Sequence, residues 1–88
     1  MTWEIRYRGS VEKDVSRLPE RIRAVALEKI VALAHDPFAV GCKKLKGQEN
    51  RFRIRIARDY RVVYSLLREE RLVIIEFVGH RKDAYRCF

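Results

Sequence analysis

The chain has 88 residues, of which 48% are hydrophobic and 36% are charged, and its formal net charge is +8. This length fits one domain, residues 1–88, with a thin core, because so small a domain buries only about 60–65% of its unfolded surface. No run approaches the roughly 20 apolar residues of a membrane span, and the first residues, MTWEIRYR, do not resemble a signal peptide. We therefore expect a cytoplasmic globular protein without a membrane partner, in which Cys42 and Cys87 are free thiols because their spacing suits no metal site.

The predicted elements begin with a strand over residues 2–8, where apolar and charged side chains alternate. Ser10 is a plausible N-cap for a helix from about residue 11 to 17. A second helix follows over 19–35, since proline is accepted in a first turn. Its apolar residues have helical spacing: Ile22, Val25, Ala26, Ile30, Leu33 and Ala34.

A loop over residues 36–50 leads into three further predicted strands. These strands cover residues 51–57, 60–67 and 71–78, and a short tail, 79–88, follows them. The sequence thus predicts an α+β fold of order β-α-α-β-β-β: an N-terminal strand, an antiparallel helical hairpin and a three-stranded antiparallel meander. The helices are expected to pack on one face of a four-stranded sheet.

The segment RFRIRIARDYRVVY, residues 51–64, separates apolar and cationic side chains only in one register. A three-residue loop pairs Ile56 with Tyr60 and Arg55 with Arg61, whereas a two-residue loop mixes both kinds on both faces. The core face then holds Phe52, Ile54, Ile56, Tyr60, Val62, Tyr64 and Leu66. The opposite face holds Arg51, Arg53, Arg55, Arg61, Val63 and Ser65.

The next hairpin is predicted to turn at Glu69 and Glu70, which pairs Val62 with Phe77 on the core face. The open face then gains an aliphatic zone beside the arginines: Leu67, Leu72, Ile74 and Val78. Exposed apolar patches often mark protein interfaces, so this zone is the predicted partner-binding surface.

The positive charge is concentrated in residues 43–61, which hold eight Lys or Arg residues against Glu49 and Asp59. Such a patch favours a polyanionic partner, with RNA or DNA the leading candidates, over a merely solvated basic surface. Like charges placed opposite each other destabilise a sheet. The pairing of Arg55 with Arg61 therefore makes most sense if an anion comes between them.

The arginine-rich hairpin, the KLKG loop before it and VGHRKDAY after it together resemble the RelE/ParE superfamily of toxin–antitoxin toxins. RelE-type members cut mRNA, typically in the ribosomal A site, whereas ParE-type members inhibit DNA gyrase without cutting RNA. The resemblance implies a catalytic set at Arg53, Arg55, Arg61, Arg81 and Tyr85, with Lys46 nearby. It also implies a small RelB-like antitoxin as partner, alongside mRNA and the ribosome, and no cofactor or metal.

Two departures from the family pattern affect the expected chemistry. RelE-type sites have lysines where this chain has Arg53 and Arg55, and arginine stays protonated, so these residues clamp phosphate rather than act as bases. Some members also carry a C-terminal helix, which we do not expect here because only three residues follow Tyr85.

His80 has a side chain suited to proton transfer near neutral pH, so it is added to the catalytic candidates, although a structural role is the alternative. The expected reaction is attack by a ribose 2′-hydroxyl on the adjacent phosphorus, with charge stabilisation by arginines. Further RNA contacts are expected from Lys43, Lys44, Lys46, Arg51, Arg58 and Lys82. A ParE-like gyrase inhibitor and a non-catalytic RNA-binding module remain as alternatives.

Overall fold

The computed structural model describes residues 2–38, 42–47 and 49–87. Its elements follow one another in this order: β1 (Glu4–Tyr7), α1 (Val11–Ser16), α2 (Glu20–His35), β2 (Lys43–Lys44), β3 (Arg51–Ala57), β4 (Tyr60–Leu67), β5 (Leu72–His80) and α3 (Arg81–Cys87). None of the helices in these ranges is long and apolar enough to cross a membrane. Cys42 is a free thiol, as predicted, while the side chain of Cys87 lies outside the described part of the chain.

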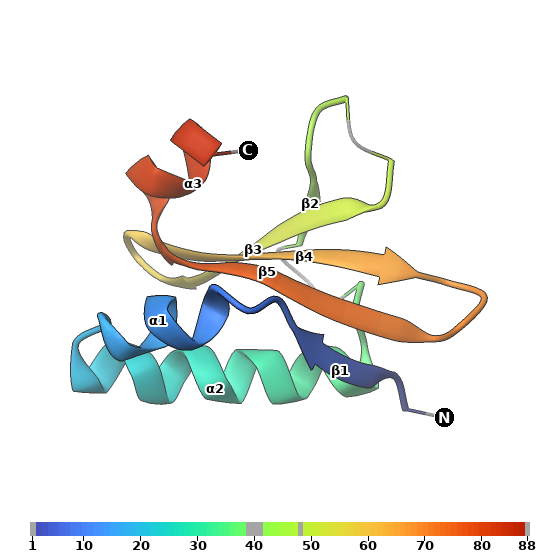
Figure 1. Ribbon diagram of the computed structural model, residues 1–88, viewed down its shortest axis with the longest axis horizontal. Helices are drawn as coiled ribbons and strands as arrows, with labels where there is room; N and C mark the ends of the chain where they lie inside the picture. Colours follow the sequence, from blue (N-terminus) through green and yellow to red (C-terminus); the bar gives the residue numbers. More distant parts are fainter. Residues whose placement is uncertain (1, 39–41, 48, 88) are drawn as a thin grey trace.

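The sheet has five strands in the order β1-β5-β4-β3-β2, and α1 and α2 lie together on one face of it (Figure 1). The predicted α+β class and the helical hairpin are confirmed. The prediction of four strands was wrong, because Lys43 and Lys44 form a short edge strand beside β3. The sheet is also mixed, since β1 runs parallel to β5 while the other pairs are antiparallel.

Helix α2 supplies most of the helical side of the main core. The helix ends at His35 as predicted, before extended Asp36, but it begins at Glu20, so Pro19 is its N-cap and not part of the predicted first turn. Its buried side chains are Ile22, Ala26, Ile30 and Leu33, at the spacing of one helix face. They pack on the strand residues Phe52, Ile54, Ile56, Val62, Tyr64, Leu66, Val73, Ile75 and Val78.

The hairpin of β3 and β4 confirms the predicted separation of faces. Arg55 lies opposite Arg61, but Tyr60 pairs with Ala57 and not with Ile56, so that detail of the prediction was wrong. The ladder shifts by one residue between Arg55 and Ala57. This β-bulge keeps the side chain of Ile56 buried while the arginines stay on the other face.

A second bulge, in β5, overturns part of the predicted register. Leu66 faces Val73 and Tyr64 faces Ile75 as expected, but Glu76 is then left over, so that Val63 pairs with Phe77 and Val62 with Val78. Because one extra residue exchanges the two faces of a strand, Val78 lies in the main core and not on the open face. Phe77, predicted for the core, lies on the opposite face.

The C-terminal segment is not the irregular tail that the sequence suggested. Residues Arg81–Cys87 form helix α3, which lies on the face of the sheet opposite to α1 and α2 (Figure 1). The backbone N–H of Lys82 donates to Nδ1 of His80 at 3.1 Å, which satisfies one of the free donors at the start of the helix. The face left bare in the prediction is therefore partly covered by α3 and by the loop between β2 and β3.

Candidate functional site

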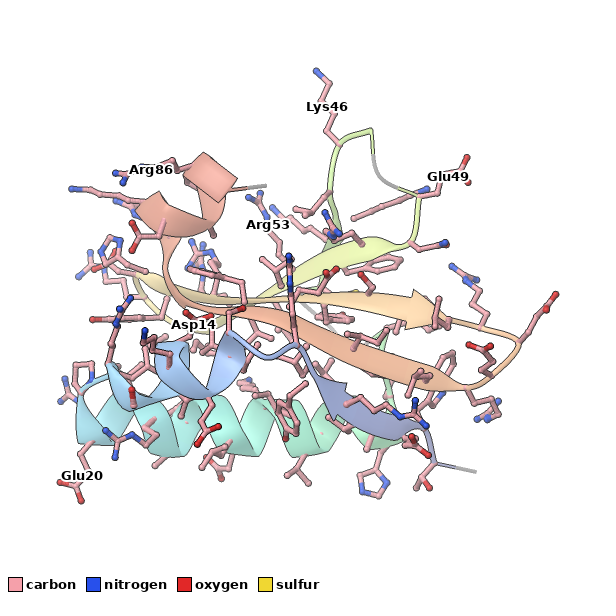
Figure 2. All side chains as sticks on the ribbon, viewed as in Figure 1. Asp14, Glu20, Lys46, Glu49, Arg53 and Arg86 are labelled. Carbon is pink, nitrogen blue, oxygen red and sulfur yellow. The ribbon has the colours of Figure 1, made fainter. Side chains whose placement is uncertain are left out.

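The candidate site lies on the face of the sheet that α1 and α2 do not cover. Because Phe52, Ile54 and Ile56 point into the core, the alternating residues of β3 point to the other side. Figure 2 shows Arg53 projecting from the sheet on the side of α3 and the β2–β3 loop, which carries Lys46. Arg61 projects to the same side from β4, opposite Arg55.

Helix α3 brings Tyr85 onto these arginines. The guanidinium carbon of Arg53 lies 5.3 Å from the centroid of the Tyr85 ring, which is a cation–π contact. The charges of Arg61 and Arg81 also act on the Tyr85 hydroxyl and lower its pKa. Four of the predicted catalytic residues, Arg53, Arg61, Arg81 and Tyr85, are thus brought together.

Arg61 is a buried cation, with only 6% of its surface exposed. Its Nη1 donates to the backbone carbonyl oxygens of Tyr60 at 2.9 Å and Arg58 at 3.2 Å. Within the described ranges, no carboxylate lies within ion-pair distance of Arg61 or Arg53. A buried charge without a counterion is costly, so this position favours an anionic ligand.

The Tyr85 hydroxyl is more acidic than an ordinary phenol. Desolvation is the largest single effect and acts to raise its pKa, but the charges of Arg53, Arg61 and Arg81 together outweigh it and lower the pKa. Tyr85 is 55% exposed, so part of its surface remains open to a ligand. The arrangement can therefore stack on a base and move a proton at the hydroxyl.

The remaining catalytic candidates differ in their surroundings. Arg55 is exposed beside Arg61, and Arg81 forms a half-exposed ion pair with Asp59, at 3.6 Å. His80 contacts Lys82 and the ring of Tyr60, at 5.5 Å between centroids. His80 lines a groove of about 760 Å³ between α1 and α3. Neither of these contacts of His80 is with Arg53, Arg61 or Tyr85. The catalytic role of His80 therefore stays a prediction.

Most of the predicted RNA-binding residues are exposed around the arginines. Lys43 of β2 lies opposite Arg53 of β3 in the ladder, so β2 extends the cationic surface to the edge of the sheet. The exposed members of the set are Lys43, Lys44, Lys46, Arg58 and Lys82. Arg51 differs, because its guanidinium is held by Glu76 at 2.7 and 3.3 Å.

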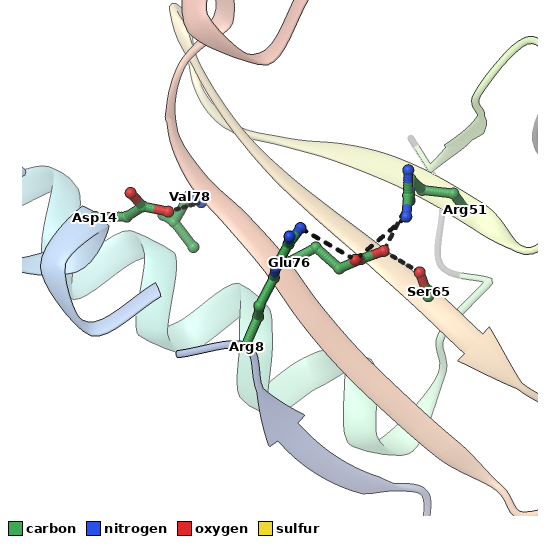
Figure 3. Close-up of polar contacts among 6 residues, drawn as sticks. All are labelled: Arg8, Asp14, Arg51, Ser65, Glu76 and Val78. Atoms are coloured by element: carbon green, nitrogen blue, oxygen red, sulfur yellow. Dashed lines mark hydrogen bonds and ion pairs between the residues drawn. The ribbon is translucent and has the colours of Figure 1, made fainter. Parts of the chain in front are cut away.

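Glu76 is an acidic residue on this face for which the sequence suggested no role. Its carboxylate also accepts a hydrogen bond from the Ser65 hydroxyl and lies 3.7 Å from Arg8 (Figure 3). The side chain is 11% exposed and ties together β3, β4, β5 and the residue that follows β1. In the sequence, this network could have been inferred from a carboxylate that the alternation places on the same face as several arginines.

The predicted antitoxin-binding residues are only partly on one surface. Leu67, Leu72 and Ile74 line a shallow groove of about 580 Å³ at the edge formed by β1 and β5, together with Tyr7. Val78 does not belong to it, because the bulge turns its side chain into the main core.

Sequence reasoning also missed a small apolar cluster beside the site. It joins Leu45 of the β2–β3 loop, Val63 of β4 and Ala84 of α3, with Phe77 of β5 packed against them. No group of three or more His, Cys, Asp or Glu side chains in the described ranges is arranged to hold a metal ion.

Comparison with known proteins places this geometry in a family. Residues 5–85 match the family model described as the ParE toxin of the type II toxin–antitoxin system, parDE. The chain is 30% identical over 89 residues to the putative toxin RelE1 of Methanocaldococcus jannaschii, covering 98% of each chain. It is 31% identical over 87 residues to toxin RelG of Mycobacterium tuberculosis, covering 98% of this chain and 99% of the relative.

A solved structure shows the same fold. The crystal structure of the toxin–antitoxin complex RelBE2 from Mycobacterium tuberculosis contains a chain that is similar with a TM-score of 0.79 and 28% sequence identity. The similarity covers 92% of this chain and 100% of that chain. The relative was therefore solved in a complex with its antitoxin.

Proposed function

Because the chain belongs to the RelE/ParE superfamily of toxins from type II toxin–antitoxin systems, we propose that it is a RelE-like endoribonuclease. In this proposal it cuts mRNA in the ribosomal A site and so stops translation and growth. The observation that carries the proposal is the cluster of Arg53, Arg61 and Arg81 around the Tyr85 hydroxyl, which a toxin that does not cut RNA does not require.

The proposed reaction is an internal transfer at phosphorus. The ribose 2′ oxygen forms a bond to the adjacent phosphorus, the bond from phosphorus to the 5′ oxygen breaks, and the 2′ proton ends on that 5′ oxygen. The products are a 2′,3′-cyclic phosphate and a 5′-hydroxyl. No water or other co-reactant is consumed, so the chain's tasks are to orient the RNA and to stabilise charge.

Each residue of the cluster has a role that fits its chemistry. Arg61 and Arg81 stabilise the extra negative charge of the phosphorane, and removing one such donor typically costs about 10²–10³ in rate. Arg53 and Arg55 clamp the phosphate backbone, since guanidinium groups match phosphate geometry but do not give up a proton. Tyr85 stacks on a base and relays the proton through its acidified hydroxyl.

The toxin is proposed to be held inactive by a small RelB-like antitoxin. The relative from Mycobacterium tuberculosis was crystallised in a toxin–antitoxin complex, and the groove lined by Leu67, Leu72 and Ile74 offers an apolar surface for such a partner. A toxin that acts on translating ribosomes works in the cytoplasm, which agrees with the expectation from the sequence.

A ParE-like gyrase inhibitor is the second candidate, and the matching family model, which describes ParE toxins, favours it. One experiment separates the two: mRNA 5′ ends are mapped after induction of the wild-type chain and of Arg61→Ala, and the DNA-damage response is recorded in the same cultures. Cuts in phase with codons that disappear in Arg61→Ala support the ribonuclease. Intact transcripts with an induced DNA-damage response contradict it and support the gyrase inhibitor.

A further inference from the structure

Helix α3 is held on the site face by contacts of Arg81 with Asp59 at its start and by one buried side chain further along. Among the side chains of α3 that the structure describes, only Ala84 is buried, at 4% exposed, while its neighbours face solvent. Ala84 packs into the small cluster formed with Leu45, Val63 and Phe77. Tyr85 is the next residue of the helix, so the packing of Ala84 contributes to where the Tyr85 ring lies relative to Arg53.

Phe77 reaches this cluster only because of the bulge in β5. Without the extra residue at Glu76, Phe77 would face the main core opposite Val62, but in the structure it pairs with Val63 on the site face. The bulge residue is held in place by Arg51 and Ser65 (Figure 3). The Glu76 network therefore supports the aromatic ring that α3 rests on.

Gly79 provides the space for that ring. A β-carbon built on Gly79 would lie 2.7 Å from Cζ of Phe77 and 3.3 and 3.4 Å from its two Cε atoms. The backbone of Gly79 is not in the left-handed region, so the need for glycine here comes from the ring and not from the chain conformation. Gly79 is also the direct ladder partner of Arg61, so the Phe77 ring is seated beside the site.

We propose that Phe77, seated over Gly79, is a positioning residue that fixes α3 and thereby holds Tyr85 against Arg53 and Arg61. The inference rests on the proposed function only for the role that it gives to Tyr85 in RNA cleavage.

The first test is Gly79→Ala, measured as mRNA cleavage by the purified full chain on programmed ribosomes. The added methyl displaces the Phe77 ring and with it Ala84, and a misplacement of about 1 Å at a catalytic group costs up to roughly 10²-fold. We expect kcat to fall by about 10- to 100-fold, with KM changed much less. Gly9→Ala is the matched control, because a β-carbon there meets nothing within 4 Å, and we expect wild-type kinetics from it.

The second test removes the clash between a methyl group at residue 79 and the Phe77 ring by replacing Phe77. Leucine is shorter than phenylalanine, so Phe77→Leu leaves room for a methyl group at residue 79 while keeping an apolar contact with Ala84. We expect Phe77→Leu alone to lower kcat a few-fold. Adding Gly79→Ala to this variant should lower kcat by less than a further twofold. This non-additivity is the signature of direct contact between the two positions.

A third readout does not depend on RNA. NMR of the chain labelled at the tyrosine ring carbons follows the ionisation of the Tyr85 hydroxyl, whose pKa is lowered by Arg53, Arg61 and Arg81 against the effect of desolvation. In Gly79→Ala the Tyr85 pKa should rise towards the ordinary value, and in the double variant it should return towards that of Phe77→Leu. If wild type cuts no RNA but the titration responds in this way, the ribonuclease function fails while the positioning role stands.

The proposal is overturned if Gly79→Ala leaves both cleavage and the Tyr85 titration as in wild type. It is also overturned if the double variant is no better than Gly79→Ala alone. Should Gly79→Ala not fold, Phe77→Leu is compared with the double variant. Values of kcat that agree within twofold between these two variants support the proposal. A kcat that is a further tenfold lower in the double variant contradicts it.

Discussion

Tyr64 and Tyr85 lie on opposite faces of the sheet, and the protein treats their hydroxyl groups in opposite ways. Tyr64 is buried in the main core, where its hydroxyl donates to the carbonyl of Pro37 at 2.7 Å, and burial raises its pKa. Tyr85 is half exposed on the site face, where neighbouring arginines lower its pKa in spite of desolvation. One face thus makes a tyrosine hydroxyl less acidic, and the other makes a tyrosine hydroxyl more acidic.

The same contrast holds for the whole of each face. The side covered by α1 and α2 buries a continuous set of aliphatic and aromatic residues. On the other side the described residues form a smaller apolar cluster, and the guanidinium of Arg61 donates to backbone carbonyl oxygens and lowers the pKa of Tyr85. Stability is therefore expected to come mostly from the first face and activity from the second, and substitutions should separate the two.

The largest expected effect on stability is at the covered face. Leu33 is fully buried, so Leu33→Ala should lower the free energy of unfolding by about 2–5 kcal/mol through lost burial and the cavity left behind. Urea unfolding measures this. Val31→Ala on the same helix is the control, because Val31 is 61% exposed and its loss should change stability by less than about 0.5 kcal/mol. Equal losses in the two variants would contradict the contrast.

The largest expected effect on activity is at Arg61. Arg61→Ala should reduce cleavage by about 10²–10³ because a buried charge proposed to stabilise the phosphorane is lost. Single-turnover cleavage on programmed ribosomes measures the rate, and circular dichroism checks the fold. Arg21→Ala, at an exposed position of α2, removes the same charge elsewhere and should keep wild-type activity. A fully active Arg61→Ala would show that the buried cation is structural.

Glu76 is an expected exception to the contrast between the two faces, because it lies on the site face but should contribute to stability. Glu76→Gln removes the counterion of Arg51 in a mostly buried network and should cost about 1–3 kcal/mol of folding free energy. Glu4→Gln breaks the exposed pair with Arg6 and should cost less than about 0.5 kcal/mol. Thermal or urea unfolding compares them, and similar small losses would mean that the Glu76 network adds little.

The smallest expected effect is a change in the Tyr85 pKa, which should distinguish Arg53 from Arg55, two arginines of β3. Arg53 lies over the Tyr85 ring and lowers its pKa, whereas Arg55 is not among the groups that shift it. Arg53→Ala should therefore raise the Tyr85 pKa, so that the hydroxyl loses its proton only at higher pH, and Arg55→Ala should leave it unchanged. Tyrosine-detected NMR titration measures both. A matching rise in the two variants would contradict the specific contact with Arg53.

Local sequence patterns predicted the parts of the fold that depend on local rules. The apolar residues at helical spacing predicted α2 to within one residue at its start, and the alternation through Phe52, Ile54 and Ile56 predicted the core face of β3. Arg55 opposite Arg61 followed from the same alternation. These features are decided by neighbours in the chain, which is why the sequence alone reveals them.

The features that were missed depend on contacts between distant residues. The bulge at Glu76 is held by residues of β3 and β4, so the local sequence of β5 does not predict it. For this reason Phe77 and Val78 were assigned to the wrong faces. Helix α3 has one described side chain that is buried, Ala84, and therefore no apolar stripe to detect. Strand β2 has two residues, which is shorter than any periodic pattern.

The most direct measurement is the chemical identity of the RNA ends produced by the purified chain on a ribosome with defined mRNA in its A site. The account predicts a cut leaving a 2′,3′-cyclic phosphate and a 5′-hydroxyl, made by wild type and lost in Arg61→Ala. Uncut mRNA under these conditions, or products with a 5′-phosphate, would contradict it.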